Sequence, residues 1–309
     1  MPLLNLIVIL ILPFMETGYS FTTAIPQPPK LPQKIISNTL LSDEILTALH
    51  EIDPTSGLKE RIVGLSEKSH DKRFSNIGEN KIAEPVAAEP EQILQRKADL
   101  VILASFNRPE YKSALMRKNI KILELIHFDT LEDLKKNISS IGEVVGVPNS
   151  SKKLLARIDS QTIKIKREAE ALRIERKRLN LKAPRILSVD AQMMTMAKAT
   201  IFDEILTLIG SENVASQMGL SGWPKIPEEM LASDSFDLIL LPEDPHNKKT
   251  SLPIWWAEMA NRPAWKLAIA KNQSHHNKFL VVPEPLLYTC SQHVFRLAEV
   301  LLEQIKQTR

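Results

Sequence analysis

A five-residue stretch occurs twice in this chain, as Asp43-Glu44-Ile45-Leu46-Thr47 and again as Asp203-Glu204-Ile205-Leu206-Thr207. Each copy follows a short aliphatic run, at residues 34–37 and 185–188. An aliphatic run followed by a stretch of mixed polarity predicts a strand followed by a helix. The copies lie too far apart for a repeat array, whose period is about 20–50 residues. The duplication therefore predicts two similar lobes.

A second match follows the first in both halves of the chain. Glu91 is followed eight residues later by Asp99, which opens the sequence Asp-Leu-Val-Ile-Leu. Glu229 is likewise followed eight residues later by Asp237, which opens Asp-Leu-Ile-Leu-Leu. Two matches in the same order favour two equivalent lobes. Such a pair suggests a ligand held between the lobes and a partner that contacts both of them.

The pattern of short aliphatic runs separated by helical stretches is typical of parallel sheets covered on both faces. We predict an α/β fold with two doubly wound lobes, whose mostly parallel sheets are joined by one long α-helix. In the first lobe we expect strands at residues 34–37, 61–66, 99–104 and 121–126 and helices at 42–51, 91–97 and 109–118, with a further helix start at 129–132. In the second lobe we expect strands at 185–189, 213–215, 237–241 and 279–282 and helices at 202–209, 228–232, 255–259 and 291–307.

A long charged segment joins the two halves. Between residues 151 and 181 the side chains of one stripe recur at helical spacing, without Gly or Pro: Leu154, Ile158, Ile165, Ala169, Leu172 and Leu179. A helix of 30 residues would be about 45 Å long. Parallel sheets bind ligands beyond the carboxyl ends of their strands, so we expect a cleft between the lobes. The predicted boundaries are 34–150 for the first lobe, 151–183 for the connecting helix and 184–309 for the second lobe.

The N-terminal segment predicts export. Residues 3–14 are almost wholly apolar, and small residues precede a possible cleavage after Ser20. We expect a signal peptide at 1–20 and a Pro-rich spacer at 21–33, with an uncleaved N-terminal anchor as the alternative. The only cysteine, Cys290, is far from this segment, so a lipoprotein is not expected. The predicted location is the periplasm.

The net charge and the motifs that are missing exclude several classes of protein. A net charge of +3 gives no reason to expect nucleic acid as a partner. The sequence contains no G-x-G-x-x-G, Walker or G-x-S-x-G motif, and Cys290 has only His293 nearby as a possible catalytic partner. We therefore predict a binding protein that is not an enzyme and needs no cofactor.

These features together resemble the helical-backbone (class III) solute-binding proteins of ABC transporters, which bind cobalamin, ferric siderophores, haem or metal ions. The resemblance runs from residue 34 to the C-terminus and includes the segment Arg262-Pro263-Ala264-Trp265-Lys266. It implies a monomer that delivers its ligand to the two transmembrane subunits of a permease. It also implies that Glu91 and Glu229 are the acids that dock on those subunits.

A shorter resemblance concerns the ligand. The sequence Trp223-Pro224-Lys225-Ile226-Pro227-Glu228-Glu229 is similar to that of cobalamin binders, in which the tryptophan lines the cleft. It implies cobalamin or a related corrinoid as the transported ligand. Ferric siderophore and haem are the alternatives, because the glycine-rich loop of the family is reduced to residues 76–80 and aromatic residues are scarce. Haem would require an axial ligand, for which Tyr111 and His127 are candidates.

Further ligand-contacting residues are expected where strands end. Phe106 follows a predicted strand of the first lobe, and Met193 and Met194 follow one of the second lobe, although methionines also fill cores. His246 follows another strand, opposite His127, with Glu243 and Asp244 near it. These residues leave transition-metal-ion binding as a weaker alternative. No pair of histidines has helical metal-site spacing, so we predict no resident metal.

Overall fold

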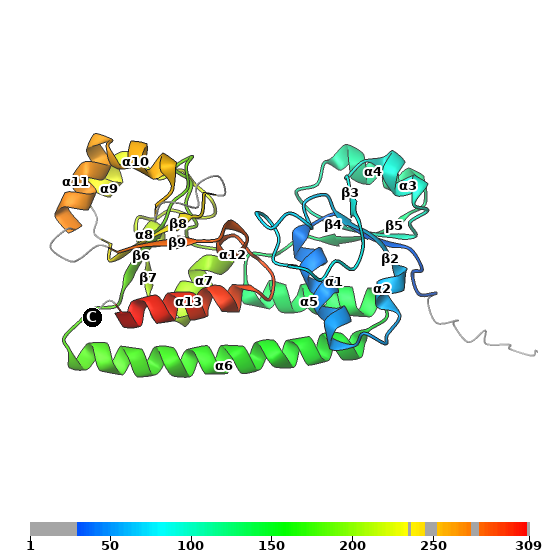
Figure 1. Ribbon diagram of the computed structural model, residues 1–309, viewed down its shortest axis with the longest axis horizontal. Helices are drawn as coiled ribbons and strands as arrows, with labels where there is room; N and C mark the ends of the chain where they lie inside the picture. Colours follow the sequence, from blue (N-terminus) through cyan, green and yellow to red (C-terminus); the bar gives the residue numbers. More distant parts are fainter. Residues whose placement is uncertain (1–29, 234–235, 245–251, 273–277, 308–309) are drawn as a thin grey trace, which may run out of the picture. The chain divides into compact units, whose positions relative to one another are not determined.

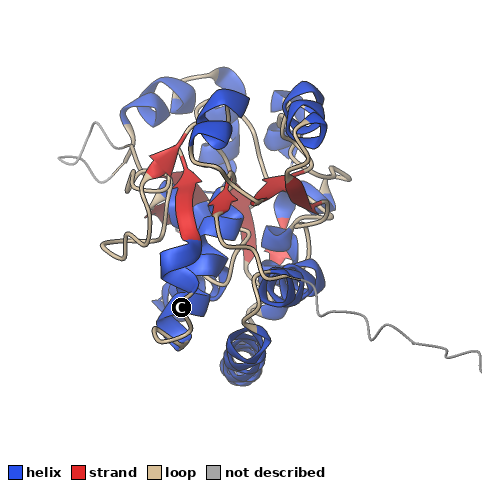
Figure 2. Cartoon of the chain, turned by 90° about the vertical axis from the view of Figure 1, so that its right-hand side faces the viewer, coloured by secondary structure: helices blue, strands red, loops and turns tan. Residues whose placement is uncertain are grey.

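A computed structural model describes residues 30–233, 236–244, 252–272 and 278–307. From Leu31 onward the chain forms one compact unit that contains both predicted lobes. Both sheets are parallel throughout, as predicted, because strands of nearly continuous Val, Ile and Leu residues are buried under helices on both faces. Figure 2 shows strands lying between helices.

The first sheet has the strand order β3-β2-β1-β4-β5; Figure 1 labels β2, β3, β4 and β5 of this sheet. Its strands are β1 (Ile35–Ser37), β2 (Ile62–Ser66), β3 (Pro85–Val86), β4 (Leu100–Ala104) and β5 (Lys121–Leu125). The helices of this lobe are α1 (Leu40–Ile52), α2 (Leu58–Arg61), α3 (Pro90–Gln95), α4 (Pro109–Arg117) and α5 (Leu131–Val144). The helix start expected at 129–132 is confirmed, because Thr130 and Asp133 form a capping box at the start of α5.

The second sheet has the strand order β7-β6-β8-β9. Its strands are β6 (Arg185–Ser188), β7 (Glu212–Asn213), β8 (Leu238–Pro242) and β9 (Lys278–Val282). The helices are α7 (Ile201–Leu208), α8 (Val214–Gln217), α9 (Glu228–Ser233), α10 (Ile254–Ala260), α11 (Pro263–Asn272), α12 (Glu284–Leu287) and α13 (Val294–Gln307). The order β2-β1-β4-β5 of the first sheet therefore corresponds to β7-β6-β8-β9 of the second.

The sequence repeats occupy equivalent places in the two sheets. The Asp-Glu-Ile-Leu-Thr copies lie in α1 and α7, the first helix after the central strand of each sheet. The second pair of copies forms β4 and β8. The Asp99 carboxylate accepts a hydrogen bond from the backbone N–H of Lys34 at 2.9 Å, and Asp237 accepts one from Arg185 at 2.8 Å. Each aspartate thus fixes the start of its strand against the strand beside it.

Two of the predicted elements differ from the structure. The strand expected at 213–215 ends at Asn213, because the Asn213 side chain accepts a hydrogen bond from the Ala215 N–H and starts α8 there. The helix expected at 291–307 begins at Val294. Cys290 lies four residues before the start of this helix.

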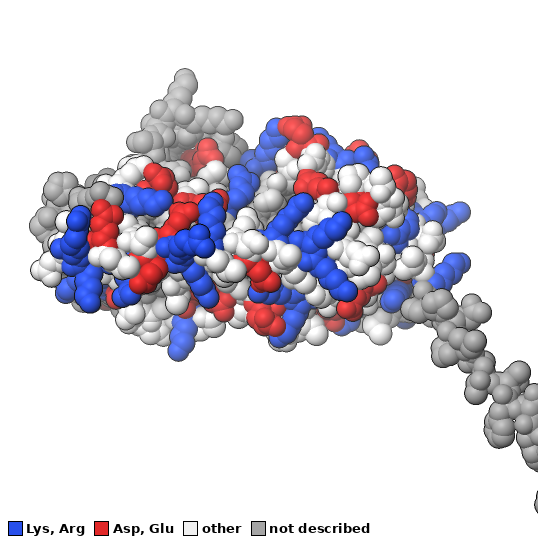
Figure 3. Space-filling model, turned by 90° about the horizontal axis from the view of Figure 1, so that it is seen from below, with Lys and Arg blue, Asp and Glu red and all other residues white. Residues whose placement is uncertain are grey.

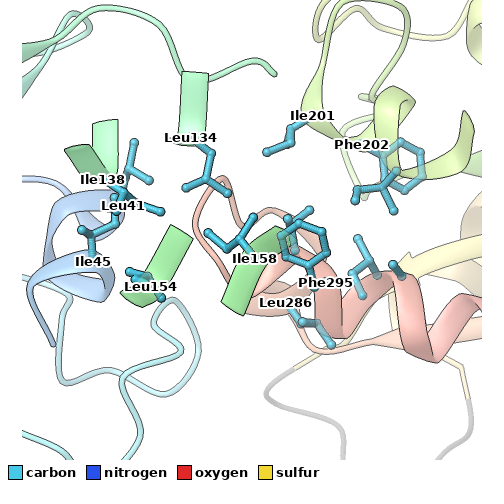
Figure 4. Packing of buried hydrophobic residues seen from close by; sticks show 14 of the residues in the cluster. Leu41, Ile45, Leu134, Ile138, Leu154, Ile158, Ile201, Phe202, Leu286 and Phe295 are labelled. Carbon is cyan, nitrogen blue, oxygen red and sulfur yellow. The ribbon is translucent and has the colours of Figure 1, made fainter. Parts of the chain in front are cut away.

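The connecting helix α6 (Pro148–Arg178) has 31 residues and packs on α1 and α5 of the first lobe and on α7 and α13 of the second. Its predicted stripe is buried except for Leu179, which follows the last turn and is exposed. Figure 4 shows Leu154 and Ile158 of α6 among side chains of both lobes. Those that surround them are Leu41, Ile45, Leu134 and Ile138 from the first lobe and Ile201, Phe202, Leu286 and Phe295 from the second. The two lobes therefore share one hydrophobic core.

None of the helices in the described part of the chain is both long enough and apolar enough to cross a membrane.

Candidate functional site

A cavity of about 260 Å³ lies where the carboxyl ends of the first-lobe strands meet the segment after β9. Thr39 follows β1, Phe106 follows β4 and Phe128 follows β5, so three strand ends contribute to one wall. The opposite wall comes from α12 and the residues after it. The full lining consists of Thr39, Leu40, Leu41, Glu44, Phe74, Phe106, Phe128, Glu284, Pro285, Tyr288, Thr289 and Cys290. The cavity is thus built from both lobes, at the place predicted for the cleft.

Aromatic rings form much of this site. The rings of Phe106 and Phe128 meet edge to face, with centroids 5.7 Å apart. On the other side, Tyr288 lies 5.8 Å from Trp223, measured between ring centroids. The side chain of Phe106 is 68% exposed and that of Trp223 is 43% exposed. Exposed aromatic rings beside a cavity are typical of surfaces that bind an apolar ligand.

A second recess, of about 320 Å³, adjoins the first along the edge of the sheet. The two share Thr39, Leu40 and Phe106 in their linings. The second also contains Ser66, Glu67 and Lys68 after β2 and Val86 and Ala88 at β3. The Phe106 ring therefore stands between two recesses of one cleft.

The carboxylate of Glu44 lies at the wall of the cavity and joins the lobes. Its Oε1 accepts hydrogen bonds from the backbone N–H and side-chain Nδ2 of Asn76, at 2.9 and 3.0 Å. Its Oε2 accepts hydrogen bonds from the hydroxyls of Thr289, at 3.4 Å, and Ser291, both in the segment after α12. Gln292 also donates to the backbone carbonyl of Glu44 at 3.0 Å. Residues 289–292 of the second lobe are thereby held on α1 of the first.

The second copy of the repeat makes the reciprocal contact. Glu204, on α7, accepts a hydrogen bond at 2.7 Å from the backbone N–H of Leu131, at the start of α5. A carboxylate at a helix N-terminus is also stabilised by the helix dipole. The glutamate of each copy therefore reaches into the other lobe. The repeat, whose pattern predicted two equivalent helices, also supplies a contact between the lobes from each of them.

The neighbouring aspartate is buried. Ser66 donates to the Asp43 carboxylate with its backbone N–H, at 3.2 Å to each oxygen, and with its hydroxyl. Burial raises the pKa of Asp43 from 3.8 to about 7, against the opposing effect of hydrogen bonds from Ser37 and Ser66. Glu44 raises it slightly further. Asp43 thus fixes α1 on β2, while its neighbour holds the other lobe.

The polar groups of the far wall are mostly uncharged. Burial raises the pKa of the Cys290 thiol to about 12, and Asp129 and Glu44 act in the same direction. Burial, followed by the charges of Asp190 and Glu284, also holds the pKa of the Tyr288 phenol well above its ordinary value. At neutral pH both side chains are protonated. They can donate hydrogen bonds, but neither is the thiolate or phenolate that binds a metal ion readily.

The residues expected to contact a ligand lie in different surroundings. Phe106 lines the cavity, and the ring of Trp223 contacts that of the lining residue Tyr288 at an interplanar angle of 53°. Met193, in contrast, is buried in the second-lobe core, where its sulfur accepts a hydrogen bond from Trp265 Nε1 at 3.3 Å. Met194 is half-buried, and its N–H donates to Asp190 at 2.8 Å. His246 lies outside the described residues.

Neither of the two residues named for haem ligation lines the cavity. Tyr111, on the buried side of α4, donates its hydroxyl hydrogen to Asn38, and His127 is exposed. The phenol that does line the cavity is Tyr288, which the sequence analysis missed. Phe128 follows the carboxyl end of β5, as Phe106 follows that of β4, so the rule that selected Phe106 would have found it too, whereas Tyr288 follows α12 and has no such signal. Within the described residues no three His, Cys, Asp or Glu side chains are grouped to hold a metal ion.

The two predicted docking acids occupy equivalent and exposed places. Glu91 lies in the first turn of α3, which precedes β4, and Glu229 lies in the first turn of α9, which precedes β8. Among the described residues neither carboxylate has an ion-pair partner, whereas the adjacent Glu228 pairs with Arg262 at 2.7 Å. Both acids are thus available on the surface, one on each lobe.

Comparison with known proteins gives the family of this fold. Residues 35–271 match the family model described as "Periplasmic binding protein". A haem binding protein from Pseudomonas aeruginosa has a TM-score of 0.65 at 19% identity, with 89% of this chain and 93% of that chain covered. The periplasmic vitamin B12 binding protein of Vibrio cholerae has a TM-score of 0.64 at 18% identity, with 90% and 98% covered.

A possible iron-binding protein from Staphylococcus epidermidis has a TM-score of 0.67 at 17% identity, with 89% of this chain and 99% of that chain covered. No curated protein matches the chain. The expectation of a solute-binding protein that is not an enzyme is confirmed by the family match, which spans most of the sequence. The chain belongs to the periplasmic binding protein family.

Proposed function

We propose that this protein is the exported solute-binding component of an ABC importer, which captures cobalamin or a related corrinoid between its lobes and delivers it to the permease in the inner membrane. The observation that carries the proposal is the cavity at the strand ends, with Phe106 and Phe128 on one side and Tyr288 and Trp223 on the other. A large, flat and partly polar ligand suits aromatic walls with a few hydrogen-bonding groups.

The chemistry of the lining supports a ligand whose metal already has its full set of ligands. The phenol of Tyr288 and the thiol of Cys290 line the cavity, and both are protonated at neutral pH because burial raises the pKa of each. Ionising either group to coordinate iron would reverse that preference at an energetic cost. A corrinoid and a ferric siderophore each bring their own ligands to the metal, so neither needs such an ionisation, whereas haem would need an axial ligand from the protein. Haem and ferric siderophores are the alternative ligands.

Binding measurements on the purified protein separate these ligands. We expect titration calorimetry with cyanocobalamin to give saturable binding, and with haemin or a ferric siderophore to give weaker binding or none. Phe106→Ala and Trp223→Ala should each weaken corrinoid binding at least about tenfold, because each removes an exposed ring that the ligand would cover. Met116→Ala, an exposed residue on α4, is the matched control and should leave the affinity unchanged. Absence of heat at tens of micromolar cyanocobalamin would refute the corrinoid assignment.

The proposed partner is a permease whose two transmembrane subunits each contact one lobe. Support comes from the equivalent placement of Glu91 and Glu229 on helices that precede corresponding strands. Surface carboxylates of this kind contribute to recognition and orientation more than to stability. The Glu91→Ala, Glu229→Ala double variant should therefore abolish transport and keep the affinity for ligand.

A matched double variant controls for the loss of two charges. Glu110 and Glu132 are also exposed first-turn acids, on α4 and α5. Their replacement by alanine changes the net charge by the same amount and should leave transport intact. Normal transport by the Glu91, Glu229 variant, or an equal defect in both double variants, would contradict the docking assignment.

A further inference from the structure

The connecting helix α6 is strongly basic, although the rest of the chain is not. Its 31 residues contain ten Lys and Arg and four Asp and Glu, a net charge of +6. The whole chain has a net charge of +3, so the remaining residues sum to −3. Figure 3 shows Lys and Arg side chains spread over the face of the molecule seen from below, the side on which Figure 1 places α6.

Most of the acids of α6 are already paired. Asp159 pairs with Lys135 at 2.6 Å, Glu168 with Lys306 at 3.3 Å and Glu170 with Arg173 at 2.7 Å. Seven exposed cations of the helix, in contrast, have no carboxylate partner among the described residues. They are Lys152, Lys153, Arg157, Lys166, Arg167, Lys177 and Arg178. The exposed side of α6 therefore carries a large uncompensated positive charge.

Apolar side chains lie among these cations. Ile163, Arg167, Ile174 and Arg178 follow one another at spacings of 4, 7 and 4 residues, which places them on one ridge of the helix. Both isoleucines are 60% exposed. The buried residues Leu154, Ile158, Ile165 and Ala169 have the same spacings nine residues earlier, and nine residues correspond to two and a half turns, so the ridge lies on the opposite side of the helix. We call this ridge and its flanking cations the outer face of α6.

The ordinary explanation for basic residues on a helix accounts for part of this pattern. Lys177 and Arg178 lie in the last turn, where the helix dipole favours positive charge. Lys152 and Lys153 lie near the other end, where the dipole favours acids, and Lys166 and Arg167 lie in the middle. Neither the dipole nor ion pairs within the described chain explains these four, nor why isoleucines are interleaved with them.

We propose that the outer face of α6 adsorbs to a bilayer surface that contains anionic phospholipid. Clustered Lys and Arg residues beside exposed aliphatic side chains suit such a surface, because the cations contact the head groups while the aliphatic side chains enter the interface. Nucleic acid would use the cations but would leave Ile163 and Ile174 exposed to water. The described outer face also presents no aromatic side chain on which a base could stack.

Adsorption by this face has a geometric consequence for the proposed function. In the first lobe, α1, α5 and α6 pack on the sheet face that contains Ile35, Leu100 and Ile102, whereas Ile93 of α3 packs with Val101 on the other face. Glu91 of α3 and the outer face of α6 thus lie on opposite sides of the first sheet. If the docking role of Glu91 holds, adsorbed protein must leave the bilayer before it docks. Adsorption itself does not depend on that role.

The strength expected is moderate and depends on salt. Each Lys or Arg near an anionic bilayer contributes about 1 kcal/mol, and the attraction extends over about 8 Å at physiological ionic strength. The test is co-sedimentation of the full-length purified protein with phosphatidylcholine vesicles that contain roughly one-third phosphatidylglycerol. We expect binding at about 0.05 M NaCl, loss of most of it at about 0.5 M, and little binding to phosphatidylcholine alone.

Two quadruple variants with equal charge changes test the face itself. Lys166→Gln, Arg167→Gln, Lys177→Gln and Arg178→Gln should together weaken vesicle binding at least about tenfold, because four of the cations that attract the anionic head groups are lost. The control replaces by glutamine four exposed cations of the first lobe, Lys59, Arg117, Lys118 and Lys121. It should bind vesicles like the unmodified protein. Both variants should keep the unmodified thermal unfolding temperature, since all eight positions are exposed.

Three results would overturn the proposal. The first is absence of binding to phosphatidylglycerol vesicles by the unmodified protein at low salt. The second is an equal loss in both quadruple variants, which would mean that net charge alone attracts the protein. The third is tighter binding to duplex DNA than to vesicles at the same salt concentration, which would make the outer face a general polyanion surface rather than a lipid surface.

Discussion

The buried Glu44 carboxylate offers the sharpest test of how the two lobes are held together. Glu44→Ala removes the acceptor of four hydrogen bonds, from the N–H and Nδ2 of Asn76 and from the hydroxyls of Thr289 and Ser291. Glu44→Gln keeps the shape of the side chain and one acceptor oxygen, which can still accept the hydrogen bonds from the N–H and Nδ2 of Asn76. It places an NH₂ group, which is a donor, opposite the two hydroxyls.

The magnitude follows from which donors lose every partner. In Glu44→Ala, Asn76 Nδ2 keeps its hydrogen bond to the carbonyl of Pro285 at 2.7 Å. The hydroxyls of Thr289 and Ser291 remain hydrogen-bonded to each other at 3.0 Å. The N–H of Asn76 and one hydroxyl proton then remain without an acceptor. A hydrogen bond to a charged group contributes about 1.5–3 kcal/mol, so Glu44→Ala should cost about 3–5 kcal/mol of unfolding free energy and Glu44→Gln about 1–3 kcal/mol.

Urea unfolding at pH 7, followed by tryptophan fluorescence, measures these free energies. Glu204→Ala is the matched comparison, since Glu204 makes one interlobe hydrogen bond and is half-buried; about 1–2 kcal/mol is expected. Glu132→Ala, at an exposed position of α5, should change the free energy by no more than about 0.5 kcal/mol. A cost below about 1 kcal/mol for Glu44→Ala, or no difference from Glu132→Ala, would refute the reasoning.

Three other predictions concern packing and pH. Gly142→Ala should destabilise the protein by about 1–3 kcal/mol in urea unfolding, because the added Cβ would lie 2.5 Å from Ser151 Cβ on α6. Glu143→Ala, on the exposed side of α5, should leave the unfolding free energy unchanged. Equal effects of the two substitutions would contradict the close contact at Gly142. Ile158→Ala should lower the unfolding free energy by about 2–5 kcal/mol. Because Ile158 lies in the core shared by the lobes, calorimetry of this variant should still show one unfolding transition, and two separated transitions would contradict a shared core. The pKa of Asp43 is raised from 3.8 to about 7, so the folded state keeps a proton that the unfolded chain releases. The resulting stabilisation of the folded state, roughly 4 kcal/mol, is complete below about pH 4 and is lost as the pH rises to about 7. Asp43→Asn should remove this fall in the unfolding free energy between about pH 4 and pH 7, measured by urea unfolding. The same pH dependence in the variant would contradict the raised pKa of Asp43.

The sheet architecture could be predicted because its signals are local. The first four residues of β4 and of β8 are all Leu, Val or Ile, and α6 has an uninterrupted apolar stripe. The two-residue strand β3 was missed, because two residues carry no periodicity. The strand predicted at 213–215 was wrong beyond Asn213, because a side-chain cap decided where the helix began.

The site was less predictable, since its residues come from distant parts of the chain. Phe106 could be identified as a candidate because it follows a strand, and the same rule would have reached Phe128 but not Tyr288, which follows α12. The contacts of Glu44 with Thr289 and Ser291 join residues about 245 positions apart, and no spacing in the sequence indicates such a pair. The periodicity of a sequence predicts which side of a helix is buried. Which residues that side contacts depends on how all the elements pack together.

The two repeat copies are equivalent in the sheets but differ in their relation to the cavity, which leads to a last prediction. Both Glu44 and Glu204 contact the other lobe, yet only Glu44 lines the cavity together with Thr289. A ligand shifts a conformational equilibrium only as far as it binds one state more tightly than another. A ligand in this cavity would lie beside the hydrogen bond between Glu44 and Thr289, so its binding free energy should change when that bond is lost. The hydrogen bond between Glu204 and Leu131 lies outside the lining.

Glu44→Ala should therefore change the affinity for the ligand at least about tenfold, and Glu204→Ala should change it less than about threefold, even though both loosen the lobes. Calorimetric titration of the two variants with the best-binding ligand of the panel tests this, at a urea-free condition in which circular dichroism shows both to be folded. Equal changes in the affinities of the two variants would mean that ligand binding depends only on how the lobes are positioned, and not on the Glu44 carboxylate. In that case the carboxylate at the cavity wall would be part of the scaffold, as the equivalent residue on α7 is.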